Sequence, residues 1–220
     1  MSSQPEIEAG QAVYTRRNLA FYDLVVHGVS NHWIWKCPTQ RLVDFCNAHV
    51  SGNHLELGVG TGLLLDSATL PSESRLVLVD LNKNCLAATT HRLARYQSKS
   101  YQRNVLEPLQ LTDESRFESA GLNYLLHCLP GDIAEKAIVL DHVAEYLGPG
   151  GVLFGSTLLN GGVKRNAAAR ALMRFYNRKG IFSNAGDTLS DLRTALTSRF
   201  AESGVEVVGC AALFWGKVHS

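Results

Sequence analysis

Three glycines alternate with other residues directly after an acid in the segment HLELGVGTGLLL, residues 54–65. The acid is Glu56, and the glycines are Gly58, Gly60 and Gly62. Glycine allows a backbone turn to pass close to a ligand where a Cβ atom would clash. A carboxylate beside such a turn attracts an ammonium or sulfonium group and repels a phosphate. These residues therefore predict a turn that binds a cationic small molecule.

The next apolar run, Arg75–Asp80, also ends in an acid. A carboxylate there can accept charge-assisted hydrogen bonds from the two hydroxyls of a ribose, and Leu81 can pack against a base. The dinucleotide fingerprint G-x-G-x-x-G would require a glycine where this chain has Leu63. An NAD-dependent oxidoreductase is therefore a disfavoured alternative, and the pattern favours a nucleoside that carries a positive charge.

The pattern E-x-G-x-G-x-G, followed by Asp80, resembles motif I and the next acid of the class I S-adenosyl-L-methionine (SAM)-dependent methyltransferases. The resemblance extends from Leu42 to Lys217, and the compact size is similar to that of small-molecule methyltransferases of microbial secondary metabolism. It implies SAM as the cofactor and S-adenosyl-L-homocysteine (SAH) as the product.

Nine residues at strand tips are the cofactor-binding residues that the resemblance implies for the core. At the third tip many family members carry an acid, whereas this chain has Asn104. An Asn carbonyl can accept the same hydrogen bond without charge. The nine residues are Glu56, Gly58, Gly60, Thr61, Asp80, Leu81, Asn104, Val105 and Asn123.

The segment NYLLHCLPGD, residues 123–132, corresponds to motif IV of the family, where cofactor and acceptor meet. His127 is expected just beyond the strand, where a histidine can remove a proton from the acceptor as the methyl arrives. We predict His127 as the general base and as an acceptor-binding residue. The alternative is a histidine that only shapes the pocket. Cys128 is expected to be buried filler.

Two further segments are expected at the acceptor side. The fifth strand tip and the helix and loop after it contribute Thr157, Tyr176, Asn177 and Phe182. The aromatic stretch before the first strand is predicted to form a lid, in which aromatic rings can face the sulfonium through cation–π attraction. The alternative is that these aromatic side chains only pack the segment onto the sheet. The lid residues are Tyr14 and Trp35 for the cofactor, and Tyr22, His27 and Trp33 for the acceptor.

Composition narrows the class of protein. The chain has 220 residues, a formal net charge of +1 and 45% hydrophobic residues, which fits one domain of ordinary size. No basic tract indicates a nucleic-acid partner, and no apolar run is long enough for a transmembrane helix. Five scattered cysteines without a C-x-x-C pair indicate reduced thiols and no metal site. Together with the polar first ten residues, they predict a cytoplasmic location.

Strands alternate with helices along the chain, which predicts a parallel sheet with right-handed crossovers. A final pair of strands turning at Gly209 predicts an antiparallel hairpin. The predicted strands are 53–57, 75–80, 101–105, 119–126, 152–157, 205–208 and 210–216. The predicted helices are 11–26, 39–50, 62–69, 82–96, 133–147, 164–178 and 188–200.

The fold class is therefore α/β, a Rossmann-like seven-stranded mostly parallel sheet with helices on both faces. We expect one domain over residues 1–220, with a lid at 1–40 and a SAM-binding core at 41–220. The predicted function is methyl transfer from SAM to an O, N, S or C atom of a small molecule, either free or tethered to a carrier. A homodimer is left open. The alternatives are a SAM-fold enzyme without methyl transfer, such as a cyclase, and a noncatalytic partner subunit.

Overall fold

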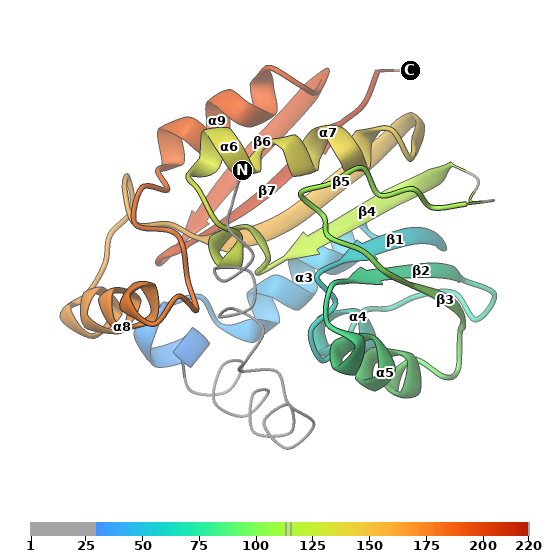
Figure 1. The fold of residues 1–220 in the computed structure, drawn as a ribbon, viewed down its shortest axis with the longest axis horizontal. Helices are drawn as coiled ribbons and strands as arrows, with labels where there is room; N and C mark the ends of the chain where they lie inside the picture. The colour runs from blue at the N-terminus through green and yellow to red at the C-terminus, as the bar shows by residue number, and fades with distance from the viewer. Residues whose placement is uncertain (1–29, 113, 115, 220) are drawn as a thin grey trace.

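One mixed sheet of seven strands organises the chain in the computed structural model, which describes residues 30–112, 114 and 116–219 (Figure 1). The strand order is β3-β2-β1-β4-β5-β7-β6. Strands β3 to β5 pair in parallel, whereas β7 runs antiparallel to β5 and to β6. The strands are β1 (Asn53–Leu57), β2 (Arg75–Asp80), β3 (Gln97–Gln102), β4 (Phe117–Asn123), β5 (Leu147–Leu158), β6 (Glu202–Val208) and β7 (Ala211–Lys217). The predicted fold class is confirmed.

Helices cover both faces of this sheet (Figure 1). One layer contains α6 (Ile133–Lys136), α7 (Ile138–Ala144) and α9 (Leu189–Thr197). The opposite layer contains α3 (Thr39–His49), α4 (Leu63–Asp66) and α5 (Lys83–Arg92), with α8 (Ala167–Arg178) at its end. A 3-10 helix, η2 (Leu126–Cys128), follows β4. No helix among the described residues is long and apolar enough to cross a membrane.

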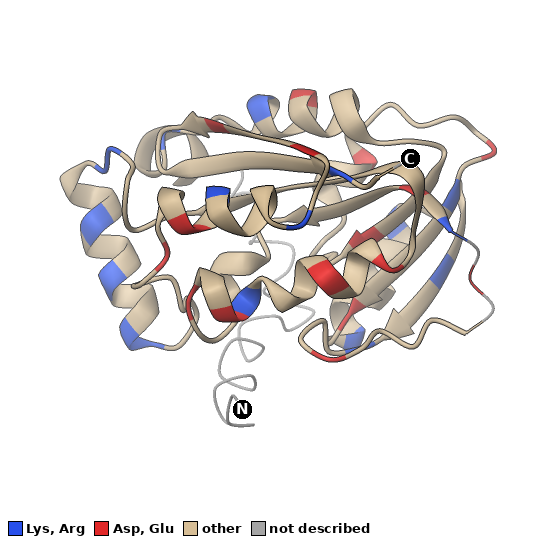
Figure 2. Ribbon diagram, turned by 90° about the horizontal axis from the view of Figure 1, so that it is seen from above, with Lys and Arg blue, Asp and Glu red and all other residues tan. Residues whose placement is uncertain are grey.

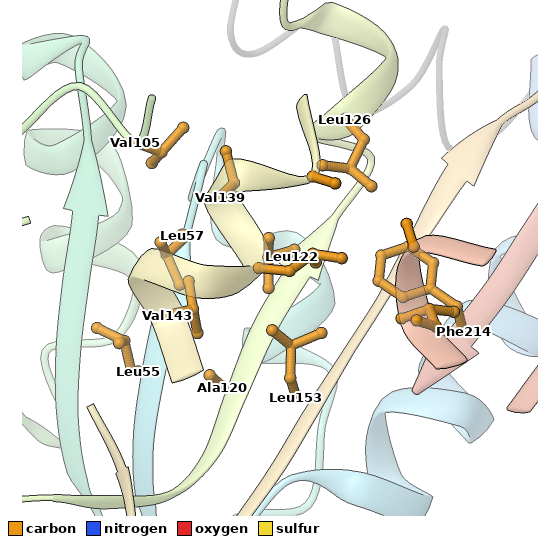
Figure 3. Packing of buried hydrophobic residues seen from close by; sticks show 14 of the residues in the cluster. Leu55, Leu57, Val105, Ala120, Leu122, Leu126, Val139, Val143, Leu153 and Phe214 are labelled. Atoms are coloured by element: carbon orange, nitrogen blue, oxygen red, sulfur yellow. The ribbon is translucent and has the colours of Figure 1, made fainter. Parts of the chain in front are cut away.

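The central strands are mostly buried because helices exclude water from both of their faces. Figure 3 shows Val139 and Val143 of α7 pointing onto Leu55 and Leu57 of β1 and Leu122 of β4. All five side chains are fully buried. Each buried aliphatic side chain stabilises the fold by about 1.5–3 kcal/mol, so this layer fixes the strand tips that carry the site.

The structure differs from the prediction at β3 and at the end of β4. Strand β3 covers Gln97–Gln102 and not 101–105, because it is an edge strand of mostly exposed polar residues without an apolar pattern. Strand β4 ends at Asn123 and not at 126, because Tyr124 takes a left-handed conformation with φ of 54°. The motif IV segment therefore leaves the sheet earlier than expected and continues as η2.

The second half of the chain also differs in detail. The helix predicted at 133–147 is two short helices that meet at Ala137, and the second ends at Ala144. Strand β5 begins at Leu147, before the glycine-rich turn, and its register with β4 shifts between Phe117 and Ser119. The hairpin turn falls at Gly209, as predicted, with φ of 60°.

Candidate functional site

The site lies where the chain reverses its direction across the sheet. Strands β1 and β4 are neighbours, and the chain runs outward from them on both sides. In open α/β sheets ligands bind beyond the carboxyl ends of strands at such a switch point. Here that edge carries the glycine turn after β1 and the Asn123–Tyr124 corner after β4.

The glycine turn is held against β2 and leaves open space beside its backbone. The N–H of Gly58 donates to the carbonyl of Val79 at 2.8 Å, which extends the β1–β2 pairing by one residue. All three glycines of the turn have positive φ. A Cβ added at Gly60 would meet no atom within 4 Å. Gly60 therefore presents bare backbone to an open space, as a ligand-binding turn requires.

A polar pocket, here called the Glu56 pocket, lies on one side of the turn. Its lining includes Glu56, the turn from Gly58 to Gly62, Thr61, Asn123 and Tyr124. Glu56 is only 6% exposed. A carboxylate that is buried and faces a pocket offers strong binding to an ammonium group.

The amide of Asn123 has a defined orientation in this pocket. Ser156 is its register partner on β5, and the Ser156 Oγ already accepts the Tyr124 N–H at 3.2 Å. The Ser156 hydroxyl therefore donates to Asn123 Oδ1, at 3.3 Å. Asn123 Nδ2 is buried and has no hydrogen-bond partner within the described part of the chain. A buried donor left unpaired is costly, so this N–H₂ group indicates a ligand that presents an oxygen acceptor.

A second, more apolar pocket, here called the Asp80 pocket, lies on the other side of the same turn. Gly58, Gly60 and Tyr124 line both pockets, so the two are continuous around the turn. Asp80 lines this pocket, and apolar side chains form most of the remaining wall. An apolar pocket that also contains a carboxylate suits a nucleoside. The lining includes Leu81, Asn104, Val105, Leu106, Leu125 and Pro130.

The Asp80 carboxylate is fixed by backbone donors on both sides. Its Oδ1 accepts the Asn82 N–H at 2.7 Å, and its Oδ2 accepts the Gly60 N–H at 3.4 Å. Burial raises the pKa of Asp80 to about 6, and these backbone N–H groups oppose the rise. Asn82, not Asp80, caps α5 by accepting the Asn84 N–H. The Asp80 carboxylate is therefore not the cap of this helix and can bind a ligand.

Asn104 lines the Asp80 pocket, but its side chain also has bonds within its own loop. Its Oδ1 accepts the Leu106 N–H at 3.1 Å, and its Nδ2 donates to Glu107 at 3.0 Å. A carbonyl oxygen has two lone pairs, so Oδ1 keeps the capacity for a further donor. The adenine-binding role predicted for Asn104 stays a prediction.

His127 and several predicted acceptor residues form one cluster, here called the aromatic cluster. The His127 ring lies 5.4 Å from the Tyr124 ring and 4.6 Å from the Phe182 ring. Phe182 in turn lies 4.8 Å from Tyr176. Thr157 Oγ1 lies 3.4 Å from His127 Nδ1. Tyr124 lines both pockets, so the cluster adjoins the switch point.

The electrostatics of His127 bear on its predicted role as a base. The Leu158 N–H donates to Nδ1 at 3.3 Å, so a neutral ring carries its proton on Nε2. Burial and, to a smaller extent, the charge of Lys136 lower the pKa of His127 to about 3. The ring is thus neutral at ordinary pH and presents an N–H donor. Removal of a proton by His127 would require the other tautomer and the loss of the Leu158 bond.

The loop that carries Phe182 is fastened by buried polar contacts. Asn177 Nδ2 donates to Asn184 Oδ1 at 2.8 Å, and the Asn184 N–H donates to Asn177 Oδ1 at 3.1 Å. The Ser183 N–H donates to the His127 carbonyl at 2.8 Å. Asn177 therefore holds the loop, and its predicted acceptor role stays a prediction.

The two predicted lid residues that the structure describes, Trp33 and Trp35, line neither pocket. Trp35 is 2% exposed, and the centroid of its ring lies 6.2 Å from that of the Phe182 ring. Trp33 is 65% exposed and contacts His32 at 4.8 Å. Tyr14, Tyr22 and His27 lie outside the described residues.

Several pocket residues were missed by sequence reasoning. Cys85 on α5, Arg103 after β3, and Leu125 and Leu129 around η2 line the Asp80 pocket. Their positions depend on how three loops converge, which no local pattern reports. Cys128 also lines this pocket, and burial raises the pKa of its thiol to about 12, so it is no thiolate nucleophile. No cluster of three or more potential metal ligands occurs among the described residues.

Comparisons with known proteins agree with this geometry. A family described as "Methyltransferase domain" matches residues 55–153. The demethylluteothin O-methyltransferase of Streptomyces thioluteus is 43% identical over 209 residues, which cover 93% of this chain and 89% of that protein. The physcion biosynthesis cluster O-methyltransferase of Aspergillus chevalieri is 36% identical, over 94% of each chain.

A solved structure supports the fold. The N-methyltransferase NodS from Bradyrhizobium japonicum, in complex with S-adenosyl-L-homocysteine, superposes with a TM-score of 0.64 over 99% of this chain and all of that chain. The two sequences are 15% identical, so this likeness concerns the arrangement of strands and helices alone.

Proposed function

This chain belongs to the SAM-dependent methyltransferase family, and on that premise we propose that it methylates an oxygen of a small secondary metabolite. The observation that carries the proposal is the pair of continuous pockets around Gly58 and Gly60. One pocket has the donors and acceptors for an amino acid, and the other has the shape and carboxylate for a nucleoside. SAM has these two parts on either side of its sulfonium.

We assign the amino-acid part of SAM to the Glu56 pocket. The Glu56 carboxylate accepts from the ammonium group, and Asn123 Nδ2 donates to a ligand oxygen. The adenosine part occupies the Asp80 pocket, where Asp80 accepts from the ribose hydroxyls and Leu81 and Val105 flank the base. When bound, SAM supplies a methyl group on a positively charged sulfur.

The aromatic cluster and Tyr124 form the acceptor side of the proposed site. Their role is to align the acceptor oxygen with the methyl carbon and the sulfur and to exclude water. The oxygen–carbon bond forms as the carbon–sulfur bond breaks, the bonding electrons pass to sulfur, and SAH leaves. The acceptor also loses the proton of its hydroxyl group.

The acceptor that fits this site has an acidic hydroxyl, such as a phenol or an enol. The conjugate-acid pKa of His127 is about 3, so its ring is a weak proton acceptor. An acidic hydroxyl can lose its proton to water before methyl transfer. The Nε2–H group of His127 can then donate to the acceptor anion. We therefore propose that His127 binds and orients the acceptor, and that it does not act as the general base.

The outer face of α8 favours an acceptor or carrier with negative charge. Arg170, Arg174 and Arg178 follow one another at helical spacing and are exposed. Figure 2 shows α8 at the left with Lys and Arg positions along it, and the helix contains no Asp or Glu. Tyr176 of the same helix belongs to the aromatic cluster. This arrangement supports an anionic acceptor, either free or tethered to an acidic carrier protein.

Calorimetric titration with SAM, SAH and NAD tests the cofactor assignment. Binding of SAM and SAH alone is the expected result, and binding of NAD alone would overturn the assignment. Acceptors of graded hydroxyl acidity are then screened by mass spectrometry. A product heavier by one methyl supports transfer, whereas a product of unchanged mass supports the cyclase alternative. Sedimentation of the same sample reports whether the chain forms a homodimer. We also propose a cytoplasmic location.

A further inference from the structure

A buried histidine that the proposed mechanism does not use stands directly behind the Glu56 carboxylate. His54 and Glu56 are separated by one residue on β1, so their side chains lie on the same face of the sheet. His54 Nε2 lies 2.8 Å from Glu56 Oε2, and the His54 side chain is fully buried. We propose that His54 is a positioning residue, which holds the Glu56 carboxylate in the orientation that receives the ammonium group of SAM. This inference rests on the proposed function.

The neighbouring strand provides space for this pair at one glycine. Gly121 of β4 is the register partner of Glu56. A Cβ added at Gly121 would overlap Glu56 Oε2 and would lie 3.2 Å from His54 Nε2. The carboxylate therefore lies over the Gly121 backbone, in a space that any other residue would fill.

The opposite nitrogen of the ring is bound to a serine pair that fixes the proton on Nε2. His54 Nδ1 lies 2.8 Å from Ser119 Oγ, and Ser119 Oγ lies 2.9 Å from Ser51 Oγ. Ser119 Oγ also accepts the Ser51 N–H at 2.9 Å. The Ser51 hydroxyl donates to the Asn53 carbonyl at 3.1 Å, so the hydrogen of the Ser119 hydroxyl is available for His54.

Only one neutral tautomer satisfies every group in this chain of hydrogen bonds. When Ser119 donates to Nδ1, the Nε2–H group donates to Glu56. When the ring carries two protons, Ser119 donates to Ser51 and Nε2–H still donates to Glu56. The remaining tautomer would place the bare Nε2 lone pair against a carboxylate oxygen. His54 thus acts as a donor to Glu56 in both satisfied states.

Packing prevents the His54 ring from turning away. The ring is stacked on Phe154 with centroids 5.7 Å apart and an angle of 28° between the planes. Phe154 is fully buried and is the register partner of Gly121 on β5. A binding group is effective when its supporting residues hold it in place before the ligand arrives. Oε2 of Glu56 is therefore engaged by the protein, while Oε1 has no hydrogen-bond partner among the described residues and remains for the ligand.

Two amide substitutions separate this role from a merely structural one. In His54→Gln, the amide nitrogen can replace Nε2 and donate to Glu56. In His54→Asn, the side chain is one methylene shorter and cannot reach Glu56, although it remains polar and can still bond Ser119. We expect SAH to bind His54→Gln within about two-fold of wild type, and His54→Asn about ten-fold or more weakly, because a hydrogen bond to a charged group is lost.

The ligand provides an internal control. 5′-Methylthioadenosine has the adenosine and sulfur of SAH and lacks its amino-acid part, so it does not use Glu56. Its affinity should be the same for wild type, His54→Gln and His54→Asn. In a Glu56→Gln background, His54→Asn should cause no further loss of SAH affinity, because the two residues act as one unit.

The outcomes distinguish this inference from the proposed function. If wild type binds SAH and both His54 variants bind it equally, the positioning role is overturned and the proposed function stands. If His54→Asn weakens 5′-methylthioadenosine as much as SAH, His54 has only a general structural role. If wild type binds neither ligand, the proposed function and the inference both fail.

Discussion

Lys136 Nζ lies 2.8 Å from Asp187 Oδ2, and both side chains are fully buried. Lys136 comes from α6, and Asp187 follows the loop that carries Phe182 and Ser183. Lys136 Nζ also donates to the Ser183 carbonyl at 2.5 Å. Burial lowers the pKa of Lys136 and raises that of Asp187, and their mutual attraction opposes both shifts. This ion pair ties the loop of the acceptor side to the helical layer.

Lys136→Met should therefore lower the free energy of unfolding by about 3–5 kcal/mol, because it leaves the Asp187 charge buried without a partner. Urea denaturation measures the loss. The matched control is Lys99→Met, because the Lys99 side chain is exposed and its partner Glu114 keeps its ion pair with Arg75, so the loss should be much smaller. Replacing both buried partners by Met and Leu should recover much of the loss. Equal losses for Lys136→Met and Lys99→Met would contradict this account of the pair.

The ionisation of Asp80 should appear in the pH dependence of nucleoside binding. Its pKa of about 6 in the free protein means that the carboxyl group is protonated below this pH. Ribose hydroxyls donate to the charged form, so ligand affinity should rise from about pH 5 to about pH 7 and then level off. Titration with 5′-methylthioadenosine measures this without an amino group that titrates on the ligand. Asp80→Asn should bind 5′-methylthioadenosine more weakly, with an affinity that does not change with pH. A pH dependence that persists in this variant would assign the ionisation to another group.

Gly121→Ala should disturb the site without touching its ligand. The added methyl overlaps the Glu56 carboxylate, so SAH affinity should fall and overpacking should lower the free energy of unfolding by about 1–3 kcal/mol. Gly52→Ala is the matched control, since a Cβ there meets its nearest atoms at an ordinary 3.6 Å. Calorimetry and thermal denaturation of the two variants make the comparison. An unchanged SAH affinity in Gly121→Ala would contradict this, because it would show that displacing the Glu56 carboxylate does not weaken SAH binding.

His127 should stay neutral over the whole pH range of enzyme activity. Its pKa of about 3 and the Leu158 N–H bond to Nδ1 predict the Nε2–H tautomer from about pH 5 to about pH 8. Nitrogen NMR of histidine-labelled protein measures both the charge and the tautomer, with His127→Gln used to assign the signal. A signal that titrates near neutral pH would restore His127 as the general base.

Sequence patterns were sufficient where one local rule decides the structure. Strands β1 and β2 have the predicted bounds: β2 is an apolar run, as is typical of a buried parallel strand, and β1 is marked by the glycine turn that follows it. Glu56 and Asp80 line the pockets because Asp80 ends β2 and Glu56 is the penultimate residue of β1. The predicted hairpin at Gly209 follows from the same reasoning, since a glycine between two apolar runs marks a turn.

Other features depend on contacts that sequence patterns do not report. Strand β3 is stabilised by pairing with β2 and has few apolar residues, so its position could not be read from hydrophobicity. The left-handed Tyr124 ends β4 in a segment that otherwise reads as a strand. The link between His54 and Glu56 requires both the alternation of β1 and the missing side chain of Gly121 on another strand.

The position of β7 between β5 and β6 has a consequence for synthesis on the ribosome. Strands β1 to β5 are complete when residue 158 has been added, but the outer edge of β5 pairs only with β7, which begins at Ala211. During translation of the intervening residues, that edge exposes unpaired N–H and carbonyl groups beside apolar side chains, which are features that promote aggregation. The nascent chain is therefore most dependent on chaperones while residues 159 to 217 are being synthesised.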